Sequence, residues 1–335
     1  MGIFVTTGGI LMDIDLRYLL FLQQIRQSLG GSFDEFFNSL SKFAVDLLPY
    51  LPYIIYWSYD RKLGYRFLSV FRISVFLNGL IKLTACVYRP WIRSDQIVPA
   101  GDSKTAATGY SFPSGHTTEA TALYGTAAVS EYKRRRWLSI LCIFLIALTG
   151  FSRNYLGVHT PQDVLVAITF SSLVIFAVIT AEKKIGDNAK IYDYLTFAGI
   201  PIVILSIAYI LLKPYPMDYV DGKLLVDPVV MRKDTFAGIG AFAGFLLASY
   251  IERHYWHNEI PVGSKTLPLM AGLGVILLFG WKKLFGPAII LPMFGTNPGT
   301  FIVRFTMSLF GVLLYPMIIR KFCTEEVKAK KEESK

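Results

Sequence analysis

Long apolar segments recur along this chain and limit its possible folds more than any other feature. Nine of them alternate with polar loops: 38–58, 64–88, 115–131, 137–152, 161–181, 195–213, 234–251, 266–281 and 300–319. A membrane-spanning helix needs about 20 such residues, so most of these segments are long enough to cross a bilayer. Because a bilayer offers no water to backbone N–H and C=O groups, spanning segments of this kind favour helices. The sequence therefore predicts an all-α, polytopic membrane protein with about nine transmembrane helices.

The composition supports the same class. Apolar residues make up 53% of the 335 residues and charged residues only 17%, whereas soluble domains carry roughly 25% charged residues. The formal net charge is +10, which would suggest nucleic-acid binding in a soluble protein. In a membrane protein Lys and Arg instead report the orientation of the chain, so no nucleic-acid partner is expected.

The positively charged loops predict that orientation. If successive apolar segments alternate between the two sides, more Lys and Arg lie on the side of the KRRR loop at 133–136 than on the other. This loop is expected in the cytoplasm, together with the C-terminal tail 322–335. The N-terminus and the loops 89–114 and 152–160 are then expected on the outer face.

Residues 1–30 are expected to form an N-terminal interfacial segment. Within it, residues 13–28 place four apolar side chains near one helical face and two arginines elsewhere. This pattern is typical of an amphipathic helix that lies at a membrane surface.

The first chemically distinctive segment is KLTACVYRP, residues 82–90. In a continuous helix, Lys82 and Arg89 would lie two turns apart on one face, about 10.5 Å along the axis. Pro90 is expected to end that helix at Arg89. As an alternative, both cations could extend to the lipid headgroups.

The second segment is YSFPSGH, residues 110–116, which immediately precedes an apolar run. Pro113 near the first turn, Ser114 as a possible cap and Gly115 as a point of close backbone approach indicate a helix N-terminus. The free N–H groups of such a terminus favour an anion, and His116 lies at the edge of that site. A purely structural cap is the alternative.

The third segment is SRNYLGVHTPQD, residues 152–163. Thr160 and Pro161 are typical of the cap and first residue of a helix, which places Asp163 about one turn after His159. A carboxylate there can hold the imidazole in one tautomer and so favours its use as a base, ligand or nucleophile. A structural histidine before a helix is the alternative.

Together the three segments place three cations, two histidines, a helix N-terminus and a carboxylate at one predicted membrane face. These are the groups needed to bind and transfer a phosphate. Their sequences, KxxxxxxRP, PSGH and SRxxxxxH, resemble the three signatures of the type 2 phosphatidic acid phosphatase (PAP2) superfamily. The resemblance covers about a quarter of the chain and implies a helical-bundle phosphatase core at 31–182.

The resemblance also implies a role for each site residue. His159 would be the nucleophile, held by Asp163, and His116 would protonate the leaving oxygen. The phosphate oxygens would be bound by a further set: Lys82, Arg89, Ser114, Gly115 and Arg153. No metal or other cofactor is expected, because a phosphohistidine intermediate splits the hydrolysis into two steps without one.

Residues 183–321 are expected to add further transmembrane helices to this core. Two outer segments, the loop 213–233 and the Gly/Pro-rich stretch 286–299, are expected to cover the site or select the substrate. Gly240 and Gly244 have the GxxxG spacing that predicts a close contact between two helices.

The expected function is hydrolysis of a phosphate monoester or pyrophosphate on the extracytoplasmic side, with a phosphorylated lipid as the substrate. A water-soluble sugar phosphate is an alternative, because nine spans and an outer N-terminus also resemble glucose-6-phosphatase. A carrier or flippase that binds a lipid phosphate without hydrolysing it is a second alternative.

Overall fold

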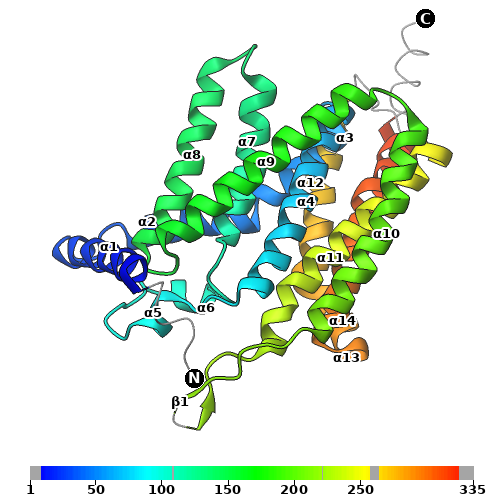
Figure 1. Cartoon of the computed structure of the whole chain (residues 1–335). Coiled ribbons are helices and arrows are strands. Elements are labelled where there is room, and N and C mark those ends of the chain that lie inside the picture. Colours follow the sequence, from blue (N-terminus) through cyan, green and yellow to red (C-terminus); the bar gives the residue numbers. More distant parts are fainter. Residues whose placement is uncertain (1–8, 108, 221, 257–263, 324–335) are drawn as a thin grey trace, which may run out of the picture. The chain divides into compact units, whose positions relative to one another are not determined.

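The computed structural model describes residues 9–107, 109–220, 222–256 and 264–323 (Figure 1). Almost all regular structure in this part of the chain is helical, which confirms the all-α prediction. The α-helices are α1 (Gly9–Ser28), α2 (Asp34–Asp46), α3 (Leu51–Ser58), α4 (Arg61–Ala85), α5 (Pro90–Arg93), α6 (Ser103–Ala106), α7 (Gly115–Glu131), α8 (Arg136–Tyr155), α9 (Pro161–Ile185), α10 (Ala189–Leu212), α11 (Pro228–Ile251), α12 (Leu267–Gly280), α13 (Gly286–Phe294) and α14 (Thr296–Leu309). A 3-10 turn, Leu48–Tyr50, precedes α3, and π-helical turns extend three helices at Glu252–Trp256, Trp281–Phe285 and Phe310–Leu314. Two short strands, β1 (Tyr219–Val220) and β2 (Lys223–Leu224), pair in an antiparallel hairpin.

Seven helical stretches of the described residues are long and apolar enough to cross a membrane, as expected for a multi-pass membrane protein. They are Arg61–Arg93, Arg136–Tyr155, Pro161–Ile185, Ala189–Leu212, Pro228–Trp256, Leu267–Phe294 and Thr296–Cys323. The expected number of nine is therefore not confirmed. The segment 115–131 forms α7, which has 17 residues.

The other missing span is the apolar segment 38–58, which forms two helices instead of one. Helix α2 ends at Asp46, and α3 begins at Leu51 after the 3-10 turn. Pro49 and Pro52 explain the break, because a proline inside a helix lacks the N–H donor and clashes with the preceding turn.

The Gly/Pro-rich segment 286–299 is helical, since α13 and the start of α14 occupy it. Pro287 is the second residue of α13, which continues the π-helical turn before it, and Pro292 lies inside α13. Gly295, with φ at +78°, separates α13 from α14.

The chain forms two compact units, each built from separate stretches of sequence. Unit 1 comprises 1–49, 80–175 and 215–231, and unit 2 comprises 50–79, 176–214 and 232–335, in both cases within the described residues. The predicted boundaries at 31–182 and 183–321 stay predictions. Of the predicted terminal segments, residues 1–8 and 324–335 lie outside the described residues.

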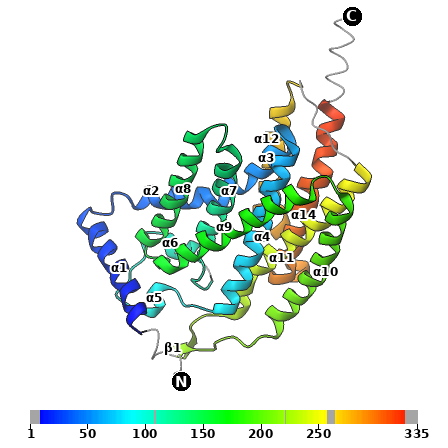
Figure 2. The same cartoon turned by 45° about the horizontal axis from the view of Figure 1, so that its top comes forward.

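In unit 1, α7 and α8 lie side by side in both views (Figures 1 and 2), and α2 packs against them. Glycines permit the close packing of this unit: a Cβ on Gly150 of α8 would lie 2.6 Å from Val164 Cγ1 of α9. Helix α1 confirms the helix predicted at 13–28, and its Asp15 pairs with Arg93 of α5 at 2.9 Å. These contacts position the α7 N-terminus, the α8 C-terminus and the α9 N-terminus.

In unit 2, the buried core forms around Tyr53, Trp57 and Tyr315. The GxxxG prediction is confirmed, because a Cβ on Gly240 or Gly244 of α11 would lie 2.3 Å from the carbonyl oxygens of two α14 residues, Phe301 and Phe305 respectively. Only glycine allows the two helix backbones to approach this closely.

Candidate active site

The three chemically distinctive segments meet within unit 1, although they are far apart in the sequence. The Ser111 N–H donates to the carbonyl of Val87 at 2.7 Å, which joins the first segment to the second. The Ser114 N–H donates to the carbonyl of Asp163 at 3.0 Å, which joins the second to the third. Backbone hydrogen bonds therefore hold the predicted site residues in one region.

The prediction that Lys82 and Arg89 share one helical face is wrong. Helix α4 ends at Ala85, Cys86 has φ at +48°, and Arg89 is extended with φ −64° and ψ 152°. Pro90 explains part of this, because the residue before a proline disfavours the helical conformation. Both cations are buried, so neither extends to the lipid headgroups.

Lys82 holds the loop that precedes α7. Its Nζ donates to the carbonyl oxygens of Tyr110 at 2.8 Å and Pro113 at 2.9 Å. Because the backbone after α4 is extended, the Arg89 side chain contacts other carbonyl oxygens than Lys82 does. Its Nε donates to the carbonyl of Gly109 at 3.0 Å, and its Nη1 donates to the carbonyl of Val158 at 2.9 Å.

The Nη1 atom of Arg89 also lies 2.9 Å from Nε2 of His159. A guanidinium group can only donate, so Nε2 must be the unprotonated nitrogen of the ring. The proton of the neutral imidazole is then on Nδ1, which lies 3.2 Å from Oδ2 of Asp163. Asp163 and Arg89 together select the tautomer whose Nε2 lone pair can attack an electrophile.

Asp163 is held in place by groups besides the histidine. Its Oδ2 accepts a hydrogen bond from the Thr160 N–H at 2.9 Å and from the Ser111 hydroxyl at 2.5 Å. Thr160 and Pro161 cap and open α9 as predicted, and the Thr160 Oγ1 accepts from the Asp163 N–H at 3.4 Å. The carboxylate that orients His159 is thus fixed by the helix cap.

Burial lowers the pKa of His159 well below its usual range, and the positive charges of Arg89, Lys82 and Arg153 lower that pKa further. The imidazole is therefore neutral at pH 7. A neutral ring is required of a nucleophile, because protonation would occupy the Nε2 lone pair.

Arg153 provides hydrogen-bond donors that the described residues leave unused. Its side chain is buried, and Nη1 donates to the hydroxyl of Ser41 in α2. Its Nε and Nη2 atoms are also buried but have no hydrogen-bond partner among the described residues. A buried donor without a partner is costly, so this arrangement favours an anion that accepts from both nitrogens.

The N-terminus of α7 provides further donors. Ser114 caps the helix, and its Oγ accepts from the Thr117 N–H at 3.4 Å and the Thr117 hydroxyl at 2.9 Å. Its own hydroxyl proton remains able to donate to a ligand. Gly115 is the first helical residue, so its N–H has no intrahelical acceptor. His116 follows in the same turn, within electrostatic reach of Arg153, Arg89 and Lys82.

The charges of this site fit a phosphate. Lys82, Arg89 and Arg153 provide three positive charges, and Asp163 provides one negative charge. The surplus of two matches the nearly dianionic charge of a phosphate monoester at neutral pH.

Four residues that the sequence did not indicate also support the site. Ser111 fixes Asp163, Ser41 holds Arg153, Thr117 orients Ser114, and the Asn154 amide donates to the His159 carbonyl at 2.9 Å. Ser111 lies beside the PSGH motif, so its position was a usable signal. Ser41 lies in an apolar segment far from every motif and offered none.

Part of the outer loop predicted at 213–233 belongs to unit 1, since this unit includes 215–231. The Tyr88 hydroxyl donates to Oδ2 of Asp218 at 2.5 Å, which ties the loop to the segment that carries Arg89. A Cβ on Gly109 would lie 3.7 Å from Met231 Sδ and 3.8 Å from Lys82 Cδ. The loop therefore contacts the backbone that surrounds the site.

Comparison with known proteins agrees with this geometry. The sequence model of the PAP2 superfamily matches residues 64–187, which include all eight predicted site residues. No solved structure matches the chain at a significant level.

Several curated proteins are similar to parts of the chain. The undecaprenyl-diphosphatase of Sulfolobus acidocaldarius is 28% identical over 149 residues, which cover 44% of this chain and 68% of that protein. Lipid phosphate phosphatase delta of Arabidopsis thaliana is 24% identical over 280 residues, 76% of this chain and 63% of its own length. Phosphatidylglycerophosphatase B of Bacillus subtilis is 31% identical over 120 residues, 34% of this chain and 58% of its own length. The chain thus spans about three fifths to two thirds of the length of these relatives, and it carries a PAP2 superfamily domain over residues 64–187.

Proposed function

We propose that this chain is an integral membrane phosphatase that hydrolyses the phosphate monoester or pyrophosphate of a lipid through a phosphohistidine intermediate. The observation that carries the proposal is the hydrogen-bonded series Arg89, His159 and Asp163, which leaves the lone pair of a neutral imidazole on Nε2. The unpartnered nitrogens of Arg153 provide a place for the phosphate oxygens.

In the first step, the Nε2 lone pair of His159 attacks phosphorus as the bond to the leaving oxygen breaks. The dianionic phosphate offsets the charges of the three neighbouring cations, so His116 is protonated in the complex and gives its proton to that oxygen. A lipid alcohol or a lipid monophosphate then leaves. Arg89 exchanges its hydrogen bond with Nε2 for one with a phosphate oxygen, and the hydrogen bond from Nδ1–H to Asp163 stabilises the charge that develops on the ring.

In the second step, water attacks the phosphohistidine. His116, now neutral, accepts a proton from the water, and the N–P bond breaks to release inorganic phosphate. Lys82, Arg89, Arg153, Ser114 and the Gly115 N–H stabilise the equatorial oxygens in both steps. Stabilisation of this charge is the main catalytic resource in phosphoryl transfer.

A lipid substrate is supported by the names of the three relatives, which act on phosphorylated lipids. The seven apolar helical stretches support it as well, because a lipid can present its headgroup from within the bilayer. No cofactor takes part in the proposed steps.

The test is phosphate release by the purified protein, in EDTA, from a panel of phosphatidate, phosphatidylglycerol phosphate, a sphingoid-base phosphate, undecaprenyl pyrophosphate and glucose 6-phosphate. We expect turnover of at least one lipid, inhibition by vanadate, and an acid-labile phosphoenzyme that is absent from His159→Ala. Normal turnover by His159→Ala would refute the mechanism. Turnover of glucose 6-phosphate alone would refute the lipid substrate, and binding without turnover would support a carrier.

We also propose that the site faces the extracytoplasmic side and that the C-terminus is cytoplasmic. The proposal rests on the excess of Lys and Arg on the side of the KRRR loop at 133–136, and it requires the 17-residue α7 to cross the membrane as well. A cysteine introduced into that loop is expected to resist membrane-impermeant thiol reagents in intact cells. Ready labelling of that cysteine would overturn the orientation.

A further inference from the structure

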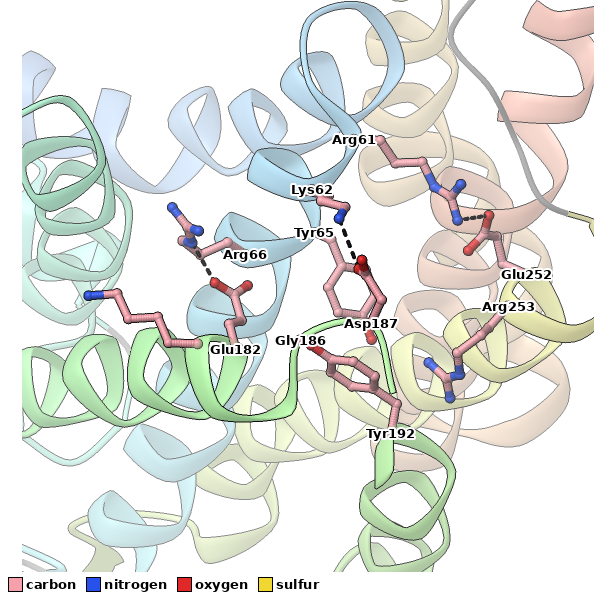
Figure 3. A pocket seen from close by; sticks show the side chains of 11 residues that line it. Arg61, Lys62, Tyr65, Arg66, Glu182, Gly186, Asp187, Tyr192, Glu252 and Arg253 are labelled. Carbon is pink, nitrogen blue, oxygen red and sulfur yellow. Dashed lines mark hydrogen bonds and ion pairs between the residues drawn. The ribbon is translucent and has the colours of Figure 1, made fainter. Parts of the chain in front are cut away.

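Unit 2 contains a polar pocket that shares no residue with the site around His159. It is about 730 Å³ in volume and is formed by the start of α4, the end of α9, the start of α10 and the π-helical turn after α11 (Figure 3). This volume lies in the range typical of small-molecule sites. We call it the α4–α11 pocket.

Eight of the eleven lining residues are charged, and the positive charges are in excess. Five lining side chains are Lys or Arg, and three are Asp or Glu. Figure 3 shows the carboxylates pointing at three of the cations: Lys62 pairs with Asp187 at 2.9 Å, Arg66 pairs with Glu182 at 2.6 Å, and Arg61 pairs with Glu252. The lining residues therefore carry a surplus of two positive charges.

The two other lining cations are Arg253 and Lys183. Arg253 pairs with Asp193, which lies outside the lining set, at 3.0 Å, and it stacks on the Tyr192 ring at 5.5 Å. Lys183 is exposed and has no ion pair among the described residues. An anion in the pocket would thus find a lysine ammonium group without a carboxylate partner.

The membrane position of the pocket indicates which anion. It is formed at helix ends that the charge distribution predicts to face the cytoplasm. Basic pockets between transmembrane helices at this face bind the phosphate-bearing headgroups of anionic lipids. We propose that the α4–α11 pocket binds a phosphate group, supplied by an anionic phospholipid of the cytoplasmic leaflet or by free phosphate, with Lys183 as its principal contact.

The test compares two adjacent lysines of α9. Lys183 lines the pocket, whereas Lys184 does not, and both are exposed. The purified protein is placed in phosphatidylcholine nanodiscs that contain phosphatidylglycerol, and bound phosphatidylglycerol is counted by native mass spectrometry. Phosphatidylglycerol is a phosphodiester, so the assay does not depend on hydrolysis at His159.

We expect Lys183→Gln to lower phosphatidylglycerol binding about tenfold, because a hydrogen bond to a charged group is lost. Lys184→Gln removes the same surface charge outside the pocket and is expected to change binding less than twofold. Asp187→Asn removes an exposed lining carboxylate and is expected to increase binding. Equal losses in the two lysine variants would mean that the surface charge of α9 attracts the lipid without a pocket, and would overturn the proposal.

A second arm distinguishes the two sources of phosphate. Radiolabelled inorganic phosphate is equilibrated with the same variants in neutral nanodiscs. If Lys183→Gln lowers the binding of inorganic phosphate alone, the pocket is assigned to free phosphate. If it lowers the binding of phosphatidylglycerol alone, the pocket is assigned to a lipid headgroup. Insensitivity of both arms to Lys183→Gln would refute the site.

Discussion

Arg153 donates a hydrogen bond from Nη1 to the hydroxyl of Ser41, and both side chains are buried. Ser41 belongs to α2, which lies outside the residues 64–187 that match the PAP2 superfamily. With Nη1 held in this way, Nε and Nη2 of Arg153 form the edge that has no partner among the described residues. A helix outside the matched region thus orients the arginine that we propose to bind the phosphate.

Ser41→Ala is expected to lower kcat/KM about tenfold, because a hydrogen bond to a charged group contributes about 1.5–3 kcal/mol and its loss lets the guanidinium rotate. Steady-state kinetics on a lipid phosphate would measure the effect. Ser41→Thr keeps the hydroxyl and should restore most of the activity. Ser39→Ala, on an exposed position of the same helix, is the control. Equal activity of the Ser41 and Ser39 variants would contradict the role of Ser41.

The low pKa of His159 predicts how activity depends on pH. Because burial and neighbouring cations depress this pKa, the nucleophilic neutral form persists as the pH falls, and the acid limb of kcat/KM lies below pH 6.5. Lys82→Met removes one of these positive charges. The pKa then rises, His159 becomes protonated at higher pH, and the acid limb moves upward.

The measurement is the pH profile of kcat/KM for the unchanged protein and for Lys82→Met. Both proteins are assayed on the same substrate, so the ionisation of that substrate contributes equally to the two profiles. Lys104→Met, at an exposed position of α6, removes a charge that is not among the main causes of the low His159 pKa, and it should leave the limb in place. A limb that stays fixed in Lys82→Met would show that His159 does not set it.

The contact between Tyr88 and Asp218 predicts a role for the 213–233 loop in substrate selection. Tyr88→Phe removes the hydrogen bond that ties this loop to the Arg89 segment. We expect KM for a long-chain lipid phosphate to rise about fivefold, the equivalent of one lost hydrogen bond, with little change for a short, soluble phosphate ester. Tyr219→Phe, at an exposed position of the same loop, is the control. Equal losses for both substrates would mean that the loop acts on the phosphate site itself.

The sequence could predict most of the site because its key residues are charged or polar groups in an otherwise apolar chain. The caps Ser114 and Thr160 were also predictable, because each is a residue type favoured at helix caps and each precedes a recognisable helix start. The direction of Arg89 was not predictable, because it depends on the positive φ of Cys86, and cysteine gives no signal for that conformation. Ser41 was missed because it is uncharged and its partner lies 112 residues further along the chain.

The GxxxG contact of α11 predicts which glycine substitution unit 2 cannot accept. In Gly240→Ala the new Cβ would lie 2.3 Å from the Phe301 carbonyl oxygen, so α11 and α14 must separate. Overpacking of this kind costs about 1–3 kcal/mol. Gly272→Ala in α12 is the matched control, because nothing lies within 4 Å of its Cβ, and alanine has the higher helix propensity. Thermal unfolding in detergent should show a lower Tm for Gly240→Ala and an unchanged or higher Tm for Gly272→Ala. A Gly240→Ala protein that keeps its Tm would mean that α11 and α14 do not pack through this glycine.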